Sequence, residues 1–294
     1  MFYRRKIILA LLQSLDREID KISLQKLLFL FTQRQKKAEY DFIPYLLGCY
    51  SYSLNADLTA MVKKEILLES KTHFKSNITD DFIKALKDDD KKILHEVIQF
   101  YGKMDAKALM KHTYINFPYW AINSIKAKDI LSTEELNRVE EFKPQNDRTV
   151  LYTIGYEGIS LEMYLNRLIK NDVKVLVDVR SNPSSMKYGF SKTRLKSYCS
   201  KIGIVYEHFP EVGIQSEQRQ ELNTQEDYDR LFTIYRENNL KKTTDAQLKI
   251  LDLLKQYERI ALTCFEANIC QCHRKDLSEA IAHLPDFEYT VKHI

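Results

Sequence analysis

The chain has 294 residues, 44% of them hydrophobic and 11% aromatic, which excludes an intrinsically disordered protein and is long enough for two folded domains. The net charge of +4 comes from the first half, because residues 1–148 hold 25 Lys and Arg against 21 Asp and Glu, whereas residues 149–294 hold 20 of each. This excess permits nucleic-acid binding but does not require it.

The sequence also excludes a membrane-spanning protein and a disulfide-stabilised one. No uncharged stretch is long enough to cross a bilayer, and the opening apolar residues are interrupted by Asp16, Arg17 and Glu18 rather than forming a signal peptide. Five cysteines, an odd number, do not indicate a disulfide framework. We therefore expect a cytoplasmic protein with reduced thiols.

Residues 1–145 are predicted to form a mostly helical domain. Apolar residues recur at helical spacing at Leu24, Leu27, Leu28 and Phe31, which predicts one buried helical face. A tyrosine-rich, turn-like segment at 41–53 and a helix at 54–64 follow. The polar, proline-containing segment 142–148 predicts a domain boundary.

Basic and aromatic residues are mixed after the first long helix. Arg34, Lys36 and Lys37 come just before Tyr40 and Tyr45, a combination that suits nucleic-acid contact. The alternative is a helical core with a solvated basic face. The first half therefore predicts a domain that binds nucleic acid or a protein partner.

Residues 149–294 alternate between strands and helices, which predicts an α/β fold with a mainly parallel sheet between two helical layers. The expected strands are 150–154, 173–179, 204–208, one that begins at Ile260, and 287–293. The expected helices are 161–170, 191–201, one around 228–235, 246–257 and 275–283. Ligand sites in such sheets lie beyond the carboxyl ends of the strands.

Polar residues gather at those strand ends and form the candidate site. Catalytic candidates are Asp178, Cys264, Glu266, Cys272 and His273, and substrate-binding candidates are Gly155, Tyr156, Arg180, Ser184, His208 and Arg274. Gly155 opens a turn whose backbone amides suit an anion, or it is an ordinary tight turn. Asp178 and Arg180 form either a structural ion pair or a functional carboxylate held by a guanidinium. Ser184 belongs to a hydroxyl-rich loop that can close over a phosphate-bearing substrate or remain solvated.

Cys272 precedes a predicted helix and adjoins His273 and Arg274, so we expect an accessible thiol whose thiolate is favoured. Glu266 and Asp178 would transfer protons, and a cleavage that uses these two carboxylates with the thiols in a supporting role is an alternative. Zinc bound by Cys264, Cys270, Cys272 and His273 is less favoured, because gaps of five, one and no residues differ from the usual paired spacing. We therefore expect no metal or other cofactor.

Five separated blocks of the second half resemble the domain-of-unknown-function 488 family over residues 150–294. The blocks are residues 152–158, 176–184, 206–208, 213–219, and Cys264-Phe-Glu together with Cys272-His-Arg. The resemblance implies a fold and a site that includes Gly155, Asp178, Arg180, Pro183 and the Cys, Glu, His and Arg residues of the last block. It implies no established reaction.

The first half resembles the helical, winged-helix-like domains of the Panacea type, found in antitoxins and phage-associated proteins. The resemblance lies in residues 24–29, in Pro44-Tyr with Gly48 and Tyr50-Ser, and in Asp57-Leu58. It implies an interaction module for protein or nucleic acid.

Together these patterns predict a two-domain protein that associates with nucleic acid or with a nucleotide-bearing substrate. An enzyme with a thiol and carboxylate cleft, a hydrolase or a thiol-dependent enzyme, is the favoured interpretation. The alternative is a non-catalytic, DNA-binding or defence-associated regulator whose cleft senses a ligand.

Overall fold

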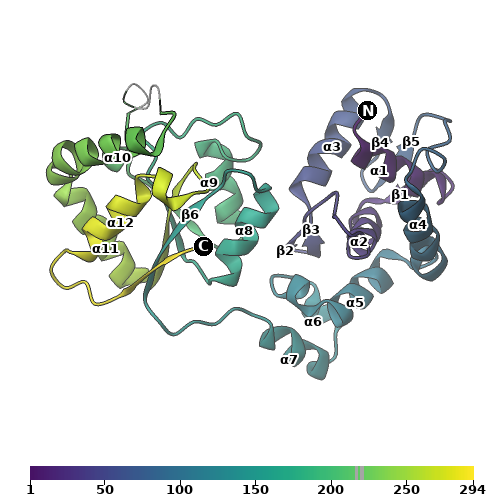
Figure 1. The fold of residues 1–294 in the computed structure, drawn as a ribbon. Helices are drawn as coiled ribbons and strands as arrows, with labels where there is room; N and C mark the ends of the chain where they lie inside the picture. Colours follow the sequence, from purple (N-terminus) through teal and green to yellow (C-terminus); the bar gives the residue numbers. More distant parts are fainter. Residues whose placement is uncertain (216–217, 219–221) are drawn as a thin grey trace. The chain divides into compact units, whose positions relative to one another are not determined.

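A computed structural model describes residues 1–215, 218 and 222–294. The chain divides into two compact units, Met1–Lys143 (unit 1) and Pro144–Ile294 (unit 2) (Figure 1). The block 213–219 of the family resemblance falls partly outside the described residues. Within these residues, every helix is too short or too polar to cross a membrane.

Unit 1 is mainly helical and carries two small antiparallel sheets. Its helices are α1 (Tyr3–Gln13), α2 (Lys21–Thr32), α3 (Tyr52–Lys63), α4 (Asp88–Tyr101), α5 (Ala106–Asn116), α6 (Ala127–Ile130) and α7 (Thr133–Glu141). One sheet has the order β1 (Glu18–Asp20), β5 (His73–Ser76), β4 (Leu67–Glu69), and the other pairs β2 (Ile43–Tyr45) with β3 (Gly48–Tyr50). The tyrosine-rich segment therefore contains a hairpin rather than turns alone, and Gly48 occupies the positive φ of +88° that such a turn requires.

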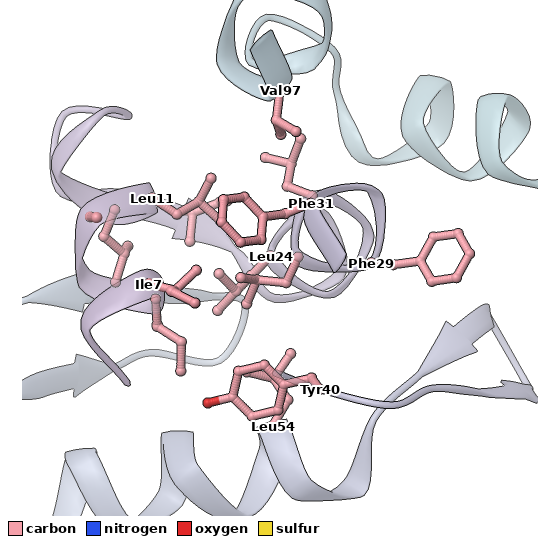
Figure 2. Close-up of a cluster of buried hydrophobic side chains, with 14 of the residues drawn as sticks. Ile7, Leu11, Leu24, Phe29, Phe31, Tyr40, Leu54 and Val97 are labelled. Carbon is pink, nitrogen blue, oxygen red and sulfur yellow. The ribbon is translucent and has the colours of Figure 1, made fainter. Parts of the chain in front are cut away.

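The core of unit 1 surrounds α2. Asp20 begins this helix by accepting hydrogen bonds from the backbone amides of Ile22 and Ser23. Figure 2 shows Leu24 and Phe31 of α2 turned toward α1, while Phe29 points away from that group. Phe29 packs edge-to-face against the rings of Phe42, Phe117 and Trp120 instead. Side chains therefore surround α2 on more than one side, beyond the single buried face expected from its spacing.

Unit 2 is an α/β domain with a five-stranded, entirely parallel sheet in the order β10-β6-β9-β7-β8. Its strands are β6 (Val150–Gly155), β7 (Val175–Asp178), β8 (Val205–His208), β9 (Arg259–Cys264) and β10 (Thr290–His293). Its helices are α8 (Leu161–Lys170), α9 (Lys192–Lys201), α10 (Gln225–Ile234), α11 (Thr244–Tyr257) and α12 (Arg274–Ala282). The predicted α/β fold with a parallel sheet is confirmed.

Helices cover both faces of this sheet. In Figure 1, α8 and α9 lie on one side of the strands and α10, α11 and α12 on the other. Val175 and Val177 of β7 pack in the cluster that includes α10–α12, and every residue of β6, β7 and β9 is buried. Burial on both faces explains why these strands are continuous apolar runs rather than alternating ones.

Strand register brings the candidate residues to one edge of the sheet. Gly155 at the end of β6 pairs with Cys264 at the end of β9. Asp178 at the end of β7 pairs with Thr263 on one side and His208 on the other. This edge, called the rim below, is where binding sites form in parallel sheets.

Candidate functional site

A pocket of about 270 Å³ opens at the rim of unit 2. Its lining combines aromatic rings, hydroxyls, an amide, a guanidinium and a thiol, and consists of Tyr156, Arg180, Ser181, Asn182, Ser184, Ser185, Ile214, Cys264 and Phe265. Four of these residues, Tyr156, Arg180, Ser184 and Cys264, are among the candidates expected from the sequence. The volume lies just below the roughly 300–1,000 Å³ typical of small-molecule sites, so the pocket suits a small ligand.

Asp178 and Arg180 form a buried ion pair behind this pocket. Arg180 donates from Nε to Asp178 Oδ1 at 2.8 Å, and Tyr206 donates its hydroxyl to Asp178 Oδ2 at 2.6 Å. Burial disfavours the charged guanidinium, but the hydrogen bonds and charge of Asp178 outweigh it and raise the pKa of Arg180. Burial, followed by the charge of Asp178, raises the pKa of Tyr206. Both oxygens of Asp178 therefore accept internal hydrogen bonds, and the side chain is fully buried.

Arg180 extends this ion pair to Tyr156, on the pocket wall. Its Nη1 donates to the Tyr156 hydroxyl at 2.7 Å and to the Phe190 carbonyl at 3.0 Å. The Tyr156 ring stacks on Phe190 with ring centroids 4.2 Å apart. His208 closes the same side by bonding from Nε2 to the Arg180 carbonyl at 2.9 Å. These contacts tie the Tyr156 and Arg180 side chains to their neighbours in the wall of the pocket.

Three potential metal ligands meet at the floor of the rim. Cys264 Sγ, Cys272 Sγ and one ring nitrogen of His273 lie within 4.8 Å of one another, and all three residues are buried. We call these three residues the thiol cluster. Cys264 comes from the end of β9, whereas Cys272 and His273 immediately precede α12. Cys264 also lines the pocket, so the cluster adjoins the space that a ligand can occupy.

The orientation of His273 is set by the backbone of the neighbouring strand. His273 Nε2 lies 3.0 Å from the Val179 carbonyl, which can only accept, so Nε2 carries the proton. In the neutral ring Nδ1 then has a lone pair, and it lies 3.7 Å from Cys264 Sγ. The imidazole therefore presents an acceptor or ligand atom to the thiol.

Glu266 stands beside the cluster on a loop held by Arg274. The Glu266 Oε2 oxygen lies 3.2 Å from Cys264 Sγ, which donates to it. Arg274 is buried and donates to the backbone carbonyls of Glu266 and Ala267 at 2.6 and 3.2 Å. Arg274 therefore positions this loop by binding the backbone of the loop. The sequence predicts substrate binding for Arg274, which is a different role.

Cys272 differs from the accessible thiol that the sequence indicates. Its side chain has no exposed surface, and burial, followed by its contacts with Cys264, raises its pKa well above the usual value. The nearby charge of Arg274 lowers the pKa, but desolvation is the larger effect. The expectation of a solvent-accessible Cys272 with a favoured thiolate is therefore wrong.

Gly155 serves a packing requirement rather than offering amides to an anion. A Cβ atom at Gly155 would lie 2.0 Å from the Glu266 carbonyl oxygen. The next two amides, of Tyr156 and Glu157, donate to the Phe265 carbonyl at 3.1 and 2.9 Å. The turn after β6 therefore binds the 265–266 backbone and lets the two segments cross closely.

The fold separates Cys270 from the other potential zinc ligands, whereas it places Ser184 in the pocket. Cys270 is exposed and lies outside the thiol cluster, so only three of the four potential zinc ligands come together. Ser184 lines the pocket, where its backbone amide donates to the Asn182 side chain at 3.1 Å.

The basic residues of unit 1 line a depression of about 580 Å³ that also contains acidic residues. Arg34 donates to the Leu30 carbonyl and the Tyr101 hydroxyl, both at 3.0 Å, and Lys36 pairs with Asp89 at 3.4 Å. The full lining is Arg34, Gln35, Lys36, Lys37, Glu39, Lys87, Asp88, Asp89, Asp90, Lys92 and Ile93. The charge of this surface is mixed, which the local sequence around Arg34 does not reveal.

Sequence reasoning missed several residues that build the pocket. Phe265 lies between Cys264 and Glu266 and is 41% exposed, and Asn182 and Ile214 come from loops. The position of Phe265 between two expected site residues was a usable signal. Tyr206, which donates to Asp178 behind the pocket, lies two residues before His208 on an alternating strand, and this spacing was a second usable signal. Nothing in the local sequence indicates Ile214.

A family model described as "Domain of unknown function DUF488" matches residues 160–281. This match covers most of unit 2, including Asp178, Arg180, Cys264, Glu266 and the residues that begin α12. Unit 2 therefore contains a domain of this family, as the sequence blocks indicate. No curated protein matches the chain.

Proposed function

We propose that unit 2 is an enzyme that hydrolyses a small nucleoside- or nucleotide-type substrate in the rim pocket. One observation carries the proposal: Cys264 lines the pocket and at the same time contacts the Glu266 carboxylate and the His273 imidazole. Through Cys264 the pocket adjoins two groups able to transfer protons, which is a common arrangement in hydrolytic sites.

The substrate class follows from the pocket lining. The partly exposed Phe265 ring offers a surface for stacking a planar base, and the Asn182 amide offers both donors and an acceptor. The Ser184 hydroxyl is available for a sugar or a ring substituent, whereas the Ser181 hydroxyl already donates to the Ile214 carbonyl at 2.7 Å. The small volume favours a nucleoside or its base over a polymer.

Hydrolysis forms a bond between the water oxygen and the reacting substrate atom and breaks the bond from that atom to its leaving group. Glu266 takes the proton from the attacking water and returns it to the leaving group, and Asp178 has no direct part. Asp178 holds Arg180 and Tyr206 and so keeps the pocket wall in place. A cleavage that uses Asp178 and Glu266 as paired carboxylates is disfavoured, because both Asp178 oxygens already accept hydrogen bonds from these neighbours.

The experiment is a turnover screen of the full-length protein against common nucleosides and nucleotides, followed by mass spectrometry of the products. Glu266→Gln keeps the shape of the side chain and removes its ability to accept a proton, so we expect a 10²–10⁴-fold loss of turnover. Glu279→Gln is the matched control, since Glu279 is an exposed glutamate of α12. Equal activity of the Glu266 variant and the wild type, or no turnover of any compound, would refute the proposal.

A non-catalytic regulator is the second candidate, and the buried state of Cys264, Cys272 and His273 favours it. Such a protein would bind a member of the same panel without converting it. Calorimetric titration with that compound separates the outcomes, because saturable binding with unchanged ligand supports the regulator.

We further propose that unit 1 assists by binding nucleic acid or a protein partner. Arg34, Lys36 and Lys37 support this proposal by their grouping on one depression, and the neighbouring Asp88, Asp89 and Asp90 weigh against strong binding. The salt dependence of binding, described in the Discussion, tests it.

A further inference from the structure

The thiol cluster has the donor set and the spacing of a zinc site. In tetrahedral zinc sites, Zn–S bonds of about 2.3 Å and Zn–N bonds of about 2.0–2.1 Å place a sulfur and a nitrogen ligand about 3.6 Å apart. Cys264 Sγ and His273 Nδ1 lie 3.7 Å apart. The same bond lengths separate two sulfur ligands by about 3.8 Å. The Sγ atoms of Cys264 and Cys272 lie within 4.8 Å of each other, so they need to move closer by no more than about 1 Å to bind one ion.

The surroundings of His273 match those of a metal ligand. A ligating imidazole usually donates its other ring N–H to a carbonyl or carboxylate, which fixes the ring and its tautomer. His273 makes this contact with the Val179 carbonyl at 3.0 Å. Its Nδ1 faces the cysteine sulfur as a result.

We propose that Cys264, Cys272 and His273 bind one Zn²⁺ ion at the floor of the rim pocket. Binding forms two Zn–S bonds and one Zn–N bond, releases the two thiol protons to solvent, and takes no proton from His273 Nδ1. Three protein ligands leave the fourth corner of the tetrahedron for water, as in catalytic rather than structural zinc sites.

Glu266 gives this fourth position a function. Its carboxylate lies 3.2 Å from Cys264 Sγ, next to the metal ligands. Zinc lowers the pKa of a bound water to about 7, and a neighbouring glutamate can take the released proton. Nucleobase deaminases use a comparable set of two cysteines and one histidine with a glutamate that is not a ligand. This role in hydrolysis rests on the proposed function, whereas metal binding itself does not.

Cys270 provides a matched control within the same loop. It is separated from Cys272 by one residue, but it is exposed and outside the cluster. A Cys270→Ser substitution therefore changes the same number of sulfur atoms without touching a proposed ligand.

The test loads the reduced, full-length protein with Zn²⁺ or Co²⁺ and removes unbound metal by gel filtration. We expect one metal per chain, a Co²⁺ spectrum with thiolate charge-transfer bands and tetrahedral d–d bands, and unchanged binding in Cys270→Ser. Cys264→Ser, Cys272→Ser and His273→Asn should each weaken metal binding at least about 100-fold, which a competing chelator measures.

Failure is recognised without any substrate. A folded, reduced wild type that retains no metal, or Cys270→Ser losing as much affinity as Cys264→Ser, would overturn the proposal. If a ligand variant does not fold, release of two protons per Zn²⁺ bound by the wild type provides the same test. Metal binding without turnover would leave this inference standing and count against the hydrolase.

Discussion

Two clusters at the same rim, the Asp178–Arg180–Tyr206 group and the thiol cluster, differ in how their polar atoms are used. Asp178 and Arg180 neutralise each other, and Tyr206 completes the carboxylate's hydrogen bonds. The thiol cluster instead brings together two sulfur atoms and an imidazole, whose mutual contacts are weak hydrogen bonds at best. The comparison teaches that strand ends gather polar residues of two kinds, those that hold the rim and those able to bind a ligand.

Removing the charge of Asp178 should have the largest effect on stability. Asp178→Asn leaves Arg180, 6% exposed, as a buried charge without its carboxylate, so we expect a loss of about 3–5 kcal/mol from the free energy of unfolding of unit 2. Urea unfolding of the full chain, followed by probes in unit 2, measures it. Asp286→Asn, which alters a surface pair with Lys255, should change stability by less than about 1 kcal/mol. Similar losses in the two variants would contradict the structural role of Asp178.

Gly155→Ala should sharpen the comparison by disturbing the loop that carries Glu266. The added Cβ would meet the Glu266 carbonyl, so either the loop moves or the strand end shifts, at a cost of about 1–3 kcal/mol. We expect metal affinity and turnover to fall together with stability. Gly158→Asn is the control, because a Cβ at Gly158 meets no atom within 4 Å and asparagine tolerates its positive φ. Tolerance of alanine at position 155 would show that the close crossing of the two segments is unimportant.

Alkylation of native, metal-free protein at neutral pH should distinguish the cysteines. Cys270 is exposed and should react first, whereas Cys199 should react only on unfolding, because burial and then the charge of Asp178 raise its pKa. Residue-resolved mass spectrometry gives the order. The raised pKa of Cys199 also makes stability depend on pH. The contribution of Cys199 to the free energy of unfolding is fully present below about pH 8.5, the usual thiol pKa, and is lost as the pH rises further. Rapid native labelling of Cys199 would be inconsistent with its burial.

The basic depression of unit 1 should give the smallest effect. Replacing Arg34, Lys36 and Lys37 with glutamine should reduce the slope of log affinity against log salt by at most about 3 for DNA, and by less if Asp88–Asp90 already offset the charge. Filter binding at several salt concentrations measures the slope. Lys63, Lys64 and Lys71, exposed elsewhere in unit 1, form the control triple. Equal effects of the two triples would mean that binding is not localised at the depression.

The sheet could be predicted from the sequence because its strands are buried on both faces. Short apolar runs such as Val175–Val177 are typical of strands buried on both faces. Because these strands are parallel, their carboxyl ends place Asp178, His208 and Cys264 at one edge of the sheet. The residues adjacent in the sequence do not indicate which role each of these side chains has at the rim. The burial of Cys272 depends on the helices packed around it. This burial raises the pKa of Cys272 more than the local charge of Arg274 lowers it.

The hairpin of unit 1 and the metal-like spacing of the thiol cluster were missed for a related reason. Short strands such as Ile43–Tyr45 are stabilised by packing rather than by their own periodicity. Cys264 and His273 are brought to 3.7 Å by the segment between β9 and α12, so their separation along the chain carries little information about their distance. The number of residues between the cysteines therefore does not predict which potential ligands lie close together in the fold.

X-ray absorption at the zinc edge, on full-length protein reconstituted with one equivalent of Zn²⁺, tests the central claim most directly. The account predicts two sulfur neighbours at about 2.3 Å and two nitrogen or oxygen neighbours at about 2.0–2.1 Å, unchanged by Cys270→Ser. A shell of nitrogen and oxygen alone, or a third sulfur that disappears in Cys270→Ser, would contradict the assignment of Cys264, Cys272 and His273 as the ligands.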